Sequence, residues 1–107
     1  MNSPPLSDYI IDKISEKYHV LIFTGITVNN TVYVRLDKIY LINRKFLFIK
    51  DTGYGETYSL ACKDLIKSLL NTNYRIRYND LYATSKIRSI IRSSFKKYKK
   101  NVSDWFE

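Results

Sequence analysis

Residues 80–100 carry the feature that most restricts what this 107-residue chain can fold into. On a helical wheel turned by about 100° per residue, their apolar and basic side chains separate onto opposite sides. The apolar side holds Ala83, Ile87, Ile90, Ile91, Ser94, Phe95 and Tyr98. The basic side holds Lys86, Arg88, Arg92, Lys96, Lys97, Lys99 and Lys100, with Ser85, Ser89 and Ser93 among them. The pattern predicts a helix, capped by Asn79 or Asp80, whose apolar side packs on a core and whose basic side faces outward.

The excess positive charge of the chain is concentrated in residues 75–100. They contain nine of the 18 Lys and Arg residues but one of the ten Asp and Glu residues, so the rest of the chain carries no net charge. Like charges such as Arg88 and Arg92 stand four residues apart, and each such pair opposes helix formation by roughly 0.2–0.5 kcal/mol. A net charge of +8 with this distribution favours an anionic partner.

Nucleic acid is the partner that we predict, with DNA ahead of RNA. Lys and Arg side chains neutralise phosphates and release counterions, and short serines between them let a helix approach a groove closely. The predicted contacts are Arg75, Arg77, Lys86, Arg88, Ser89, Arg92, Lys96, Lys99 and Lys100. We therefore expect a small basic protein that binds nucleic acid through the basic side of helix 80–100.

The sequence leaves a second class of function open, that of a protein-interaction module. The same helix would suit an acidic host protein. Trp105 and Phe106, in an acidic and aromatic tail over residues 101–107, would suit a pocket on a partner or on the second copy of a homodimer. The alternative for the tail is that both rings fold back onto the core. A basic helix lying on an anionic membrane ranks lower, because so small a core needs the apolar side of the helix.

The rest of the chain predicts a single α+β domain over residues 1–107, with one modest core. We expect a short flexible arm over 1–6, an N-terminal helix, an antiparallel β-meander of three to five strands, and two C-terminal helices of which the last is strongly basic. The predicted helices before it span 8–18, capped by Ser7, and 56 or 57 to 70. The predicted strands span 20–28, 31–36, 39–42 and 46–49, with 74–78 as an edge strand or a linker.

Three details of the sheet follow from the pattern of apolar residues. Both faces of residues 20–28 are apolar at the start, which favours a central strand. A two-residue loop after this strand would pair Ile26 with Tyr33, and a three-residue loop would pair it with Val34. We prefer the second register because it gives a cleaner apolar face. Residues 51–55 contain two glycines, which we interpret as a turn that uses positive φ angles.

Tyrosines could also form a stacking surface for single-stranded nucleic acid. Tyr33, Tyr40 and Tyr54 would form it if they are exposed near Arg35, Lys38 and Arg44. If they are half-buried they are ordinary sheet residues, which is the interpretation that we prefer.

No residue pattern predicts catalysis, a metal site or a cofactor. His19 is the only histidine and Cys62 the only cysteine, and the carboxylates are scattered along the chain. We therefore expect no enzyme and no catalytic residue. No apolar run approaches the roughly 18 residues that span a bilayer. The N-terminus has no signal-peptide pattern and a lone cysteine suits a reducing compartment, so we expect an intracellular protein in the cytoplasm, nucleus or nucleoid of a host.

The composition suggests a type of source. The chain has thirteen Ile, twelve Lys, ten Tyr and eight Asn residues but two Ala residues. Ile, Lys, Asn and Tyr have A/T-rich codons, which suggests an A/T-rich genome such as those of many viruses, phages and some archaea. We therefore expect a viral or phage regulator.

Overall fold

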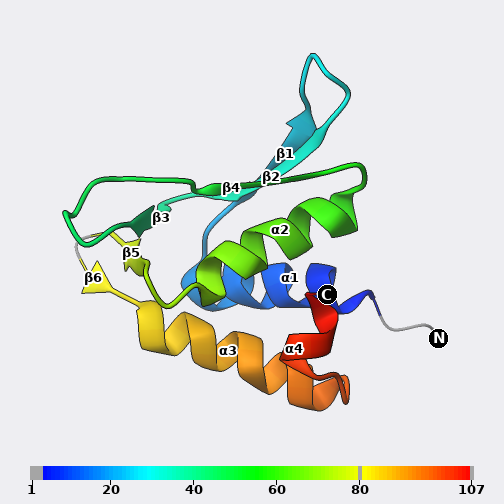
Figure 1. Ribbon diagram of the computed structural model, residues 1–107. Coiled ribbons are helices and arrows are strands. Elements are labelled where there is room, and N and C mark those ends of the chain that lie inside the picture. Colours follow the sequence, from blue (N-terminus) through cyan, green and yellow to red (C-terminus); the bar gives the residue numbers. More distant parts are fainter. Residues whose placement is uncertain (1–3, 80, 107) are drawn as a thin grey trace.

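The computed structural model describes residues 4–79 and 81–106. Within them an N-terminal helix is followed by antiparallel strands in two small sheets and then by C-terminal helices, which confirms the predicted α+β class (Figure 1). The helices are α1 (Leu6–Tyr18), α2 (Tyr58–Leu70), α3 (Thr84–Lys97) and the short α4 (Val102–Trp105). The strands are β1 (Ile22–Ile26), β2 (Val32–Leu36), β3 (Ile39–Ile42), β4 (Thr52–Gly55), β5 (Arg75–Tyr78) and β6 (Leu81–Tyr82).

The apolar sides of the three long helices meet in one core. α1 buries Ile10, Ile11 and Ile14 completely, and the strands add Val34 and Ile76. Because apolar residues three and four apart lie on one side of a helix, this burial follows from their spacing. In Figure 1, α1 lies between α2 and α3, and α3 forms the lower border of the molecule. Strands β1, β2 and β4 lie beyond α2, whereas β3, β5 and β6 lie at the end of the molecule where α2 ends and α3 begins.

The first sheet has the strand order β1-β2-β4 and differs from the prediction in two ways. Ile26 pairs with Val32, so the predicted pairing with Val34 is wrong. The Thr27 N–H donates to the carbonyl oxygen of Thr31, so the loop closes over residues 28–30, one residue earlier than predicted. Within it the Thr27 hydroxyl oxygen accepts from the N–H groups of Asn29 and Thr31. Strand β1 is also an edge strand, with Ile26 69% exposed, so its predicted central position is wrong. The β1–β2 hairpin projects from the body of the molecule (Figure 1).

Residues 52–55, which we predicted as part of a turn, form strand β4 and lie directly on α2. Neither glycine of this strand has a positive φ. A Cβ atom at Gly53 would lie 2.1 Å from the carbonyl oxygen of Ala61, and one at Gly55 would lie 2.7 Å from the Ala61 nitrogen. The two glycines are therefore needed for the close approach of a strand to a helix, and the predicted use of positive φ is wrong.

The second sheet has the order β3-β5-β6, and its last strand occupies residues that we predicted as the start of the basic helix. Leu81 and Tyr82 pair with β5 across a turn in which Asn79 has φ 54°, so α3 begins at Thr84. Asp80, a predicted cap, lies outside the described residues. Strand β5 is central in this sheet, which corrects its prediction as an edge strand or linker. The predicted strand over 46–49 is reduced to one bridge between Ile42 and Phe48.

Both ends of the described chain pack on the domain. Leu6 is buried at the start of α1, so the predicted arm over 1–6 does not include it, and residues 1–3 lie outside the described part. The Tyr98 hydroxyl donates to the carbonyl oxygen of Pro4 at 2.7 Å. In the tail, the Trp105 ring packs edge-on against Phe95 with 5.0 Å between ring centres.

Candidate nucleic-acid interface

Helix α3 is fixed in orientation by its apolar side. Ile87 and Ile91 are fully buried and Phe95 is 2% exposed. Ser94, on the same side, is buried and donates its hydroxyl to the carbonyl oxygen of Ile90 at 2.7 Å. The basic side of the helix must therefore face away from the core, as the sequence predicts.

The exposed side of α3 has an ordered arrangement of small and charged residues. A stripe of serines, spaced four positions apart, runs along its middle: Ser85, Ser89 and Ser93. On the helical wheel, Arg92 and Lys96 lie along one border of this stripe, whereas Lys86 and Lys97 lie along the other. All seven of these side chains are exposed. We call this surface the α3 face.

Helix α1 extends the α3 face on one side. Two shallow hollows of about 480 and 300 Å³ follow the line between α1 and α3. Lys17 lines the first hollow and Lys13 the second, opposite Lys86 and Lys97 of α3. The Lys97 ammonium donates to the Tyr9 hydroxyl at 3.2 Å and lies 4.7 Å from the centre of that ring.

The sequence analysis missed the two lysines of α1. The signal was present, because Lys13 and Lys17 stand four residues apart on the polar side of a predicted helix. What the sequence does not contain is the packing of α1 beside α3, which turns two separate helices into one basic surface.

The positive charge of α3 is not neutralised within the described part of the chain. No Lys or Arg side chain of α3 forms an ion pair with a carboxylate of residues 4–79 or 81–106. The Lys50 ammonium and the Asp64 carboxylate do form an ion pair, at 2.7 Å, but it joins the segment before β4 to α2. Among the described residues, the α3 face therefore carries positive charge that no carboxylate balances, and such a surface attracts anions.

Arg88 is placed differently from the other predicted contacts. Its guanidinium donates to the carbonyl oxygens of Leu69, Asn71 and Tyr74, the first at 2.9 Å and the last at 2.7 Å. Partial burial and the neighbouring charge of Arg92 lower the pKa of Arg88. Arg88 thus joins α3 to the end of α2 and the following turn, and we leave it out of the proposed contact set.

The remaining predicted basic residues lie at the two ends of α3. Lys99 and Lys100 follow the helix and share a hollow of about 500 Å³ with Arg92 and Lys96. At the other end, Arg75 lines a hollow of about 410 Å³ together with Ser85 and Arg92.

Arg77 lies apart from α3. It is half-buried on β5, with its guanidinium 6.0 Å from the centre of the Phe48 ring. The structure therefore gathers most of the predicted residues along α3, but it places Arg77 on the sheet.

The aromatic rings of the tail pack on the domain. Trp105 and Phe106 are half-buried, stack edge-on with 4.8 Å between ring centres, and pack against the core. Lys63 of α2 lies 5.1 Å above the Trp105 ring. These contacts agree with the alternative in which the tail folds back onto the core.

The predicted tyrosine surface is not assembled. Tyr33 and Tyr54 are cross-strand partners in the first sheet, whereas Tyr40 belongs to the second sheet and contacts Phe48. The exposed aromatic residues near the arginines of β5 are instead Phe46, Phe48 and Tyr82. The sequence analysis missed these because they belong to a loop and to a two-residue strand that has no periodic pattern.

Within the described residues, no three His, Cys, Asp or Glu side chains gather into a group that could hold a metal ion. Burial raises the pKa of the Cys62 thiol to about 12, against a smaller opposite effect of its hydrogen bond with Tyr58. In the described part of the chain, no helix has the length and apolar character needed to cross a membrane.

Comparison with known proteins gives no family. The sequence matches no protein-family model and no curated protein, and the fold matches no solved structure.

Proposed function

We propose that this chain is a non-enzymatic DNA-binding protein that places the α3 face in the major groove of a duplex. The observation that carries the proposal is the stripe of Ser85, Ser89 and Ser93 between two rows of cations. Short hydroxyl side chains allow a helix to approach the base edges closely, where Ser can accept or donate hydrogen bonds. Cations on both borders of the stripe can reach the phosphates of the two strands that border a groove.

The dimensions of the helix favour DNA over RNA. An α-helix with its side chains is about 10–12 Å wide, and the major groove of B-form DNA is about 12 Å wide. The major groove of A-form RNA is deep and too narrow for such a helix. The 14 residues of α3 extend for roughly 21 Å, which is enough to follow the groove across several base pairs.

Binding to labelled duplexes at several salt concentrations tests the proposal. We expect the logarithm of the association constant to fall with the logarithm of salt concentration, with a slope equivalent to roughly four to seven phosphate contacts. Lys86→Gln/Lys97→Gln removes one border of the stripe and Arg92→Gln/Lys96→Gln removes the other. Each double variant should reduce the slope by about two contacts. Lys13→Gln/Lys17→Gln should reduce it as well, because these lysines line the same hollows.

A matched control separates the α3 face from total charge. Lys38 and Lys67 are exposed and lie outside α1 and α3. Lys38→Gln/Lys67→Gln removes the same two charges and should leave the slope nearly unchanged. Equal effects of the control and the α3 variants, or no binding at low salt, would contradict the proposal.

The alternative partner is an acidic host protein bound by the same α3 face. If duplex DNA is not bound while an acidic protein is captured and the α3 variants release it, this alternative replaces the proposal. For the biological setting, we propose a viral or phage regulator that acts inside the host cell. The abundance of Ile, Lys, Asn and Tyr, whose codons are A/T-rich, supports the source, and the proposed binding to DNA would place the protein in the compartment that contains DNA.

A further inference from the structure

The outer face of the second sheet carries alternating aromatic and basic side chains. Tyr40, Arg77 and Tyr82 are direct cross-strand partners on β3, β5 and β6, so they share one face of the sheet. Arg75, two residues before Arg77, lies on the same face, with its guanidinium 6.0 Å from the centre of the Tyr82 ring. The opposite face packs on the core through residues such as Ile76, which is fully buried.

The loop between β3 and β4 adds two phenylalanines to this face. The Phe48 ring lies 5.1 Å from Tyr40, and the Phe46 ring lies 6.4 Å from Tyr82, measured between ring centres. Phe46 has φ 61°, a conformation that bulky residues rarely adopt. The Asn43 side-chain oxygen stabilises this loop by accepting from the N–H groups of Lys45 and Leu47. The loop thus holds aromatic rings outward in a defined geometry.

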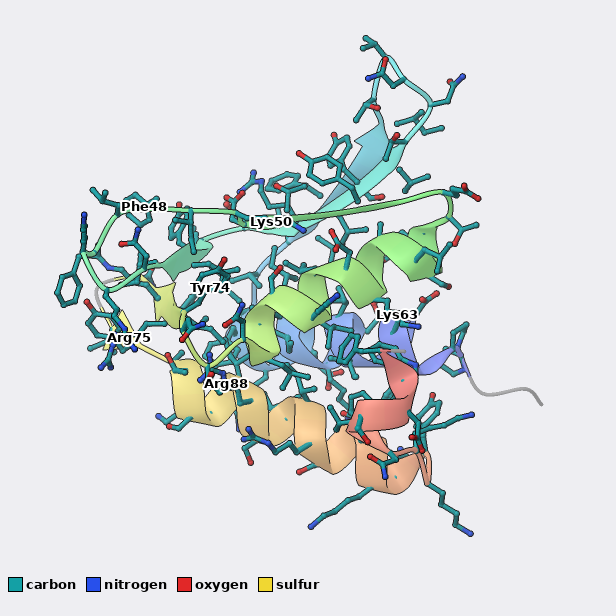
Figure 2. All side chains as sticks on the ribbon, in the orientation of Figure 1. Phe48, Lys50, Lys63, Tyr74, Arg75 and Arg88 are labelled. Atoms are coloured by element: carbon teal, nitrogen blue, oxygen red, sulfur yellow. The ribbon has the colours of Figure 1, made fainter. Side chains whose placement is uncertain are left out.

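These rings remain open to solvent. Phe46 is 64% exposed, Phe48 is 61% exposed and Tyr82 is 50% exposed. We call Tyr40, Phe46, Phe48 and Tyr82, with Arg75 and Arg77, the aromatic patch. Figure 2 shows Phe48 and Arg75 at the end of the molecule formed by this sheet, with Arg88 nearby at the start of α3.

We infer that the aromatic patch stacks unpaired nucleotides, so that the protein binds a duplex with a single-stranded extension more tightly than a blunt duplex. Exposed rings among arginines match the requirements of single-stranded nucleic acid, because every base has a face that can stack and every nucleotide carries a negative phosphate. The patch is continuous with the α3 face, since one hollow is lined by Arg75 and Tyr82 of the patch and by Ser85 and Arg92 of α3.

The inference names the substrate class of the proposed function and rests on it. A DNA molecule whose duplex part lies on the α3 face continues across the aromatic patch of the second sheet as a single strand. The charge of Arg75 and the π face of Tyr82 then lie where the two forms of the strand meet. The sequence-specific part of the interaction, if the serines read bases, would remain on α3.

Binding assays with three labelled ligands test the inference. These are a blunt duplex, the same duplex with an extension of about six unpaired nucleotides, and the extension strand alone. We expect the extended duplex to bind about tenfold or more tightly than the blunt duplex, since each stacked base adds substantially to affinity. A 2-aminopurine base in the extension should change its fluorescence when the protein binds.

Variants of the patch separate this inference from the proposed function. Phe48→Ala should remove the preference for the extension and leave affinity for the blunt duplex unchanged. Phe46→Ser is a second variant in the same loop, with the same expected result. Tyr54→Ala changes a 48% exposed ring outside the patch and should have no effect. Thermal melting of each variant checks that the fold persists.

The outcomes are distinguishable. Equal affinity of the normal protein for the blunt and extended duplexes would overturn the inference and leave the proposed function intact. Binding of the extension strand alone, lost in Phe48→Ala and without binding of the blunt duplex, would support the aromatic patch and overturn the duplex model of α3. An unchanged preference in all patch variants would also overturn the inference.

Discussion

The Arg88 Nε group donates a hydrogen bond to the carbonyl oxygen of Leu69 at 2.9 Å, which joins the basic helix to the end of α2. Leu69 belongs to the last turn of α2, whose carbonyl oxygens have no partner within the helix. The Arg88 Nη2 group also donates to the carbonyl oxygens of Asn71 and Tyr74, so one guanidinium satisfies three backbone acceptors. Its positive charge is well placed at the negative end of the α2 dipole.

Removal of this guanidinium should destabilise the fold. We expect Arg88→Ala to lower the free energy of unfolding by about 2–3 kcal/mol, because hydrogen bonds to charged groups are lost and their acceptors stay partly buried. Arg88→Lys should recover only part of the loss, since an ammonium cannot reproduce the planar fork of a guanidinium. Arg92→Ala, on the exposed side of the same helix, should cost about 0.5 kcal/mol or less. Urea denaturation measures all three, and an equal loss in Arg88→Ala and Arg92→Ala would refute this role.

The contact between β4 and α2 gives a second prediction. Gly53→Ala should lower the free energy of unfolding by about 3 kcal/mol or more, because the new methyl group would collide with backbone atoms of Ala61 and Leu65. Gly25→Ala is the matched control, since its methyl group would meet only the ring of Tyr33, a side chain that can move. If thermal melting shows similar losses for the two variants, the strand and helix are less closely packed than described.

The helices could be predicted from the sequence because their signal is local. Apolar residues three and four apart specify which side of α1, α2 and α3 is buried, without knowledge of the rest of the chain. Which residues form strands depends on the segments that they pair with, and these segments are distant in the sequence. Residues 81–82 fit a helical pattern, yet pairing with β5 makes them a strand. Gly53 and Gly55 have the composition of a turn, yet a helix packed against them makes them a strand.

The candidate site shows the same division. The outward orientation of the α3 cations follows from the helical wheel, and the structure agrees with it. The role of each cation depends on the groups that surround it. Arg88 and Arg92 belong to the same basic side of the helix in the sequence, yet Arg88 binds the end of α2 and Arg92 is exposed. The placement of Lys13 and Lys17 beside α3, and of Phe48 beside Arg77, is long-range and could not be predicted from the sequence alone.

The buried Cys62 thiol and the half-buried Tyr58 hydroxyl should make stability fall at alkaline pH. Burial raises the pKa of Cys62 from 9.0 to about 12, and burial together with Cys62 raises the pKa of Tyr58 above its usual 10.0. The folded state therefore keeps protons that the unfolded chain releases. Unfolding then releases protons, so the free energy of unfolding should decrease as the pH rises from about 9 towards 12.

Substitutions at Tyr58 and Cys62 can show whether these residues cause the loss of stability at alkaline pH. Tyr58→Phe and Cys62→Ala should each flatten the fall in unfolding free energy between about pH 9 and pH 12, even though Cys62→Ala lowers stability at neutral pH by leaving a cavity. Tyr54→Phe alters an exposed tyrosine and should leave the slope unchanged. The measurement is urea denaturation at each pH, and a slope identical in all four proteins would exclude the Tyr58 and Cys62 pair as its source.

A substitution in the serine stripe should affect helix stability and DNA binding in opposite directions. Ser89 lies three residues after Lys86 and three residues before Arg92, and no carboxylate balances these cations on α3. A carboxylate at position 89 would form two favourable pairs along the helix, each contributing roughly 0.2–0.5 kcal/mol. The same carboxylate would lie in the middle of the α3 face, where it would repel phosphates.

We therefore expect Ser89→Glu to raise the melting temperature slightly and to weaken duplex binding by about tenfold or more at low salt. Asn29→Glu, in the loop of the β1–β2 hairpin, changes the net charge equally and should leave binding within about twofold of the normal protein. Opposite changes in stability and binding for Ser89→Glu would show that α3 keeps its repulsive charges for a partner rather than for its fold. A variant that is more stable and binds DNA as well as the normal protein would remove the α3 face from the interface.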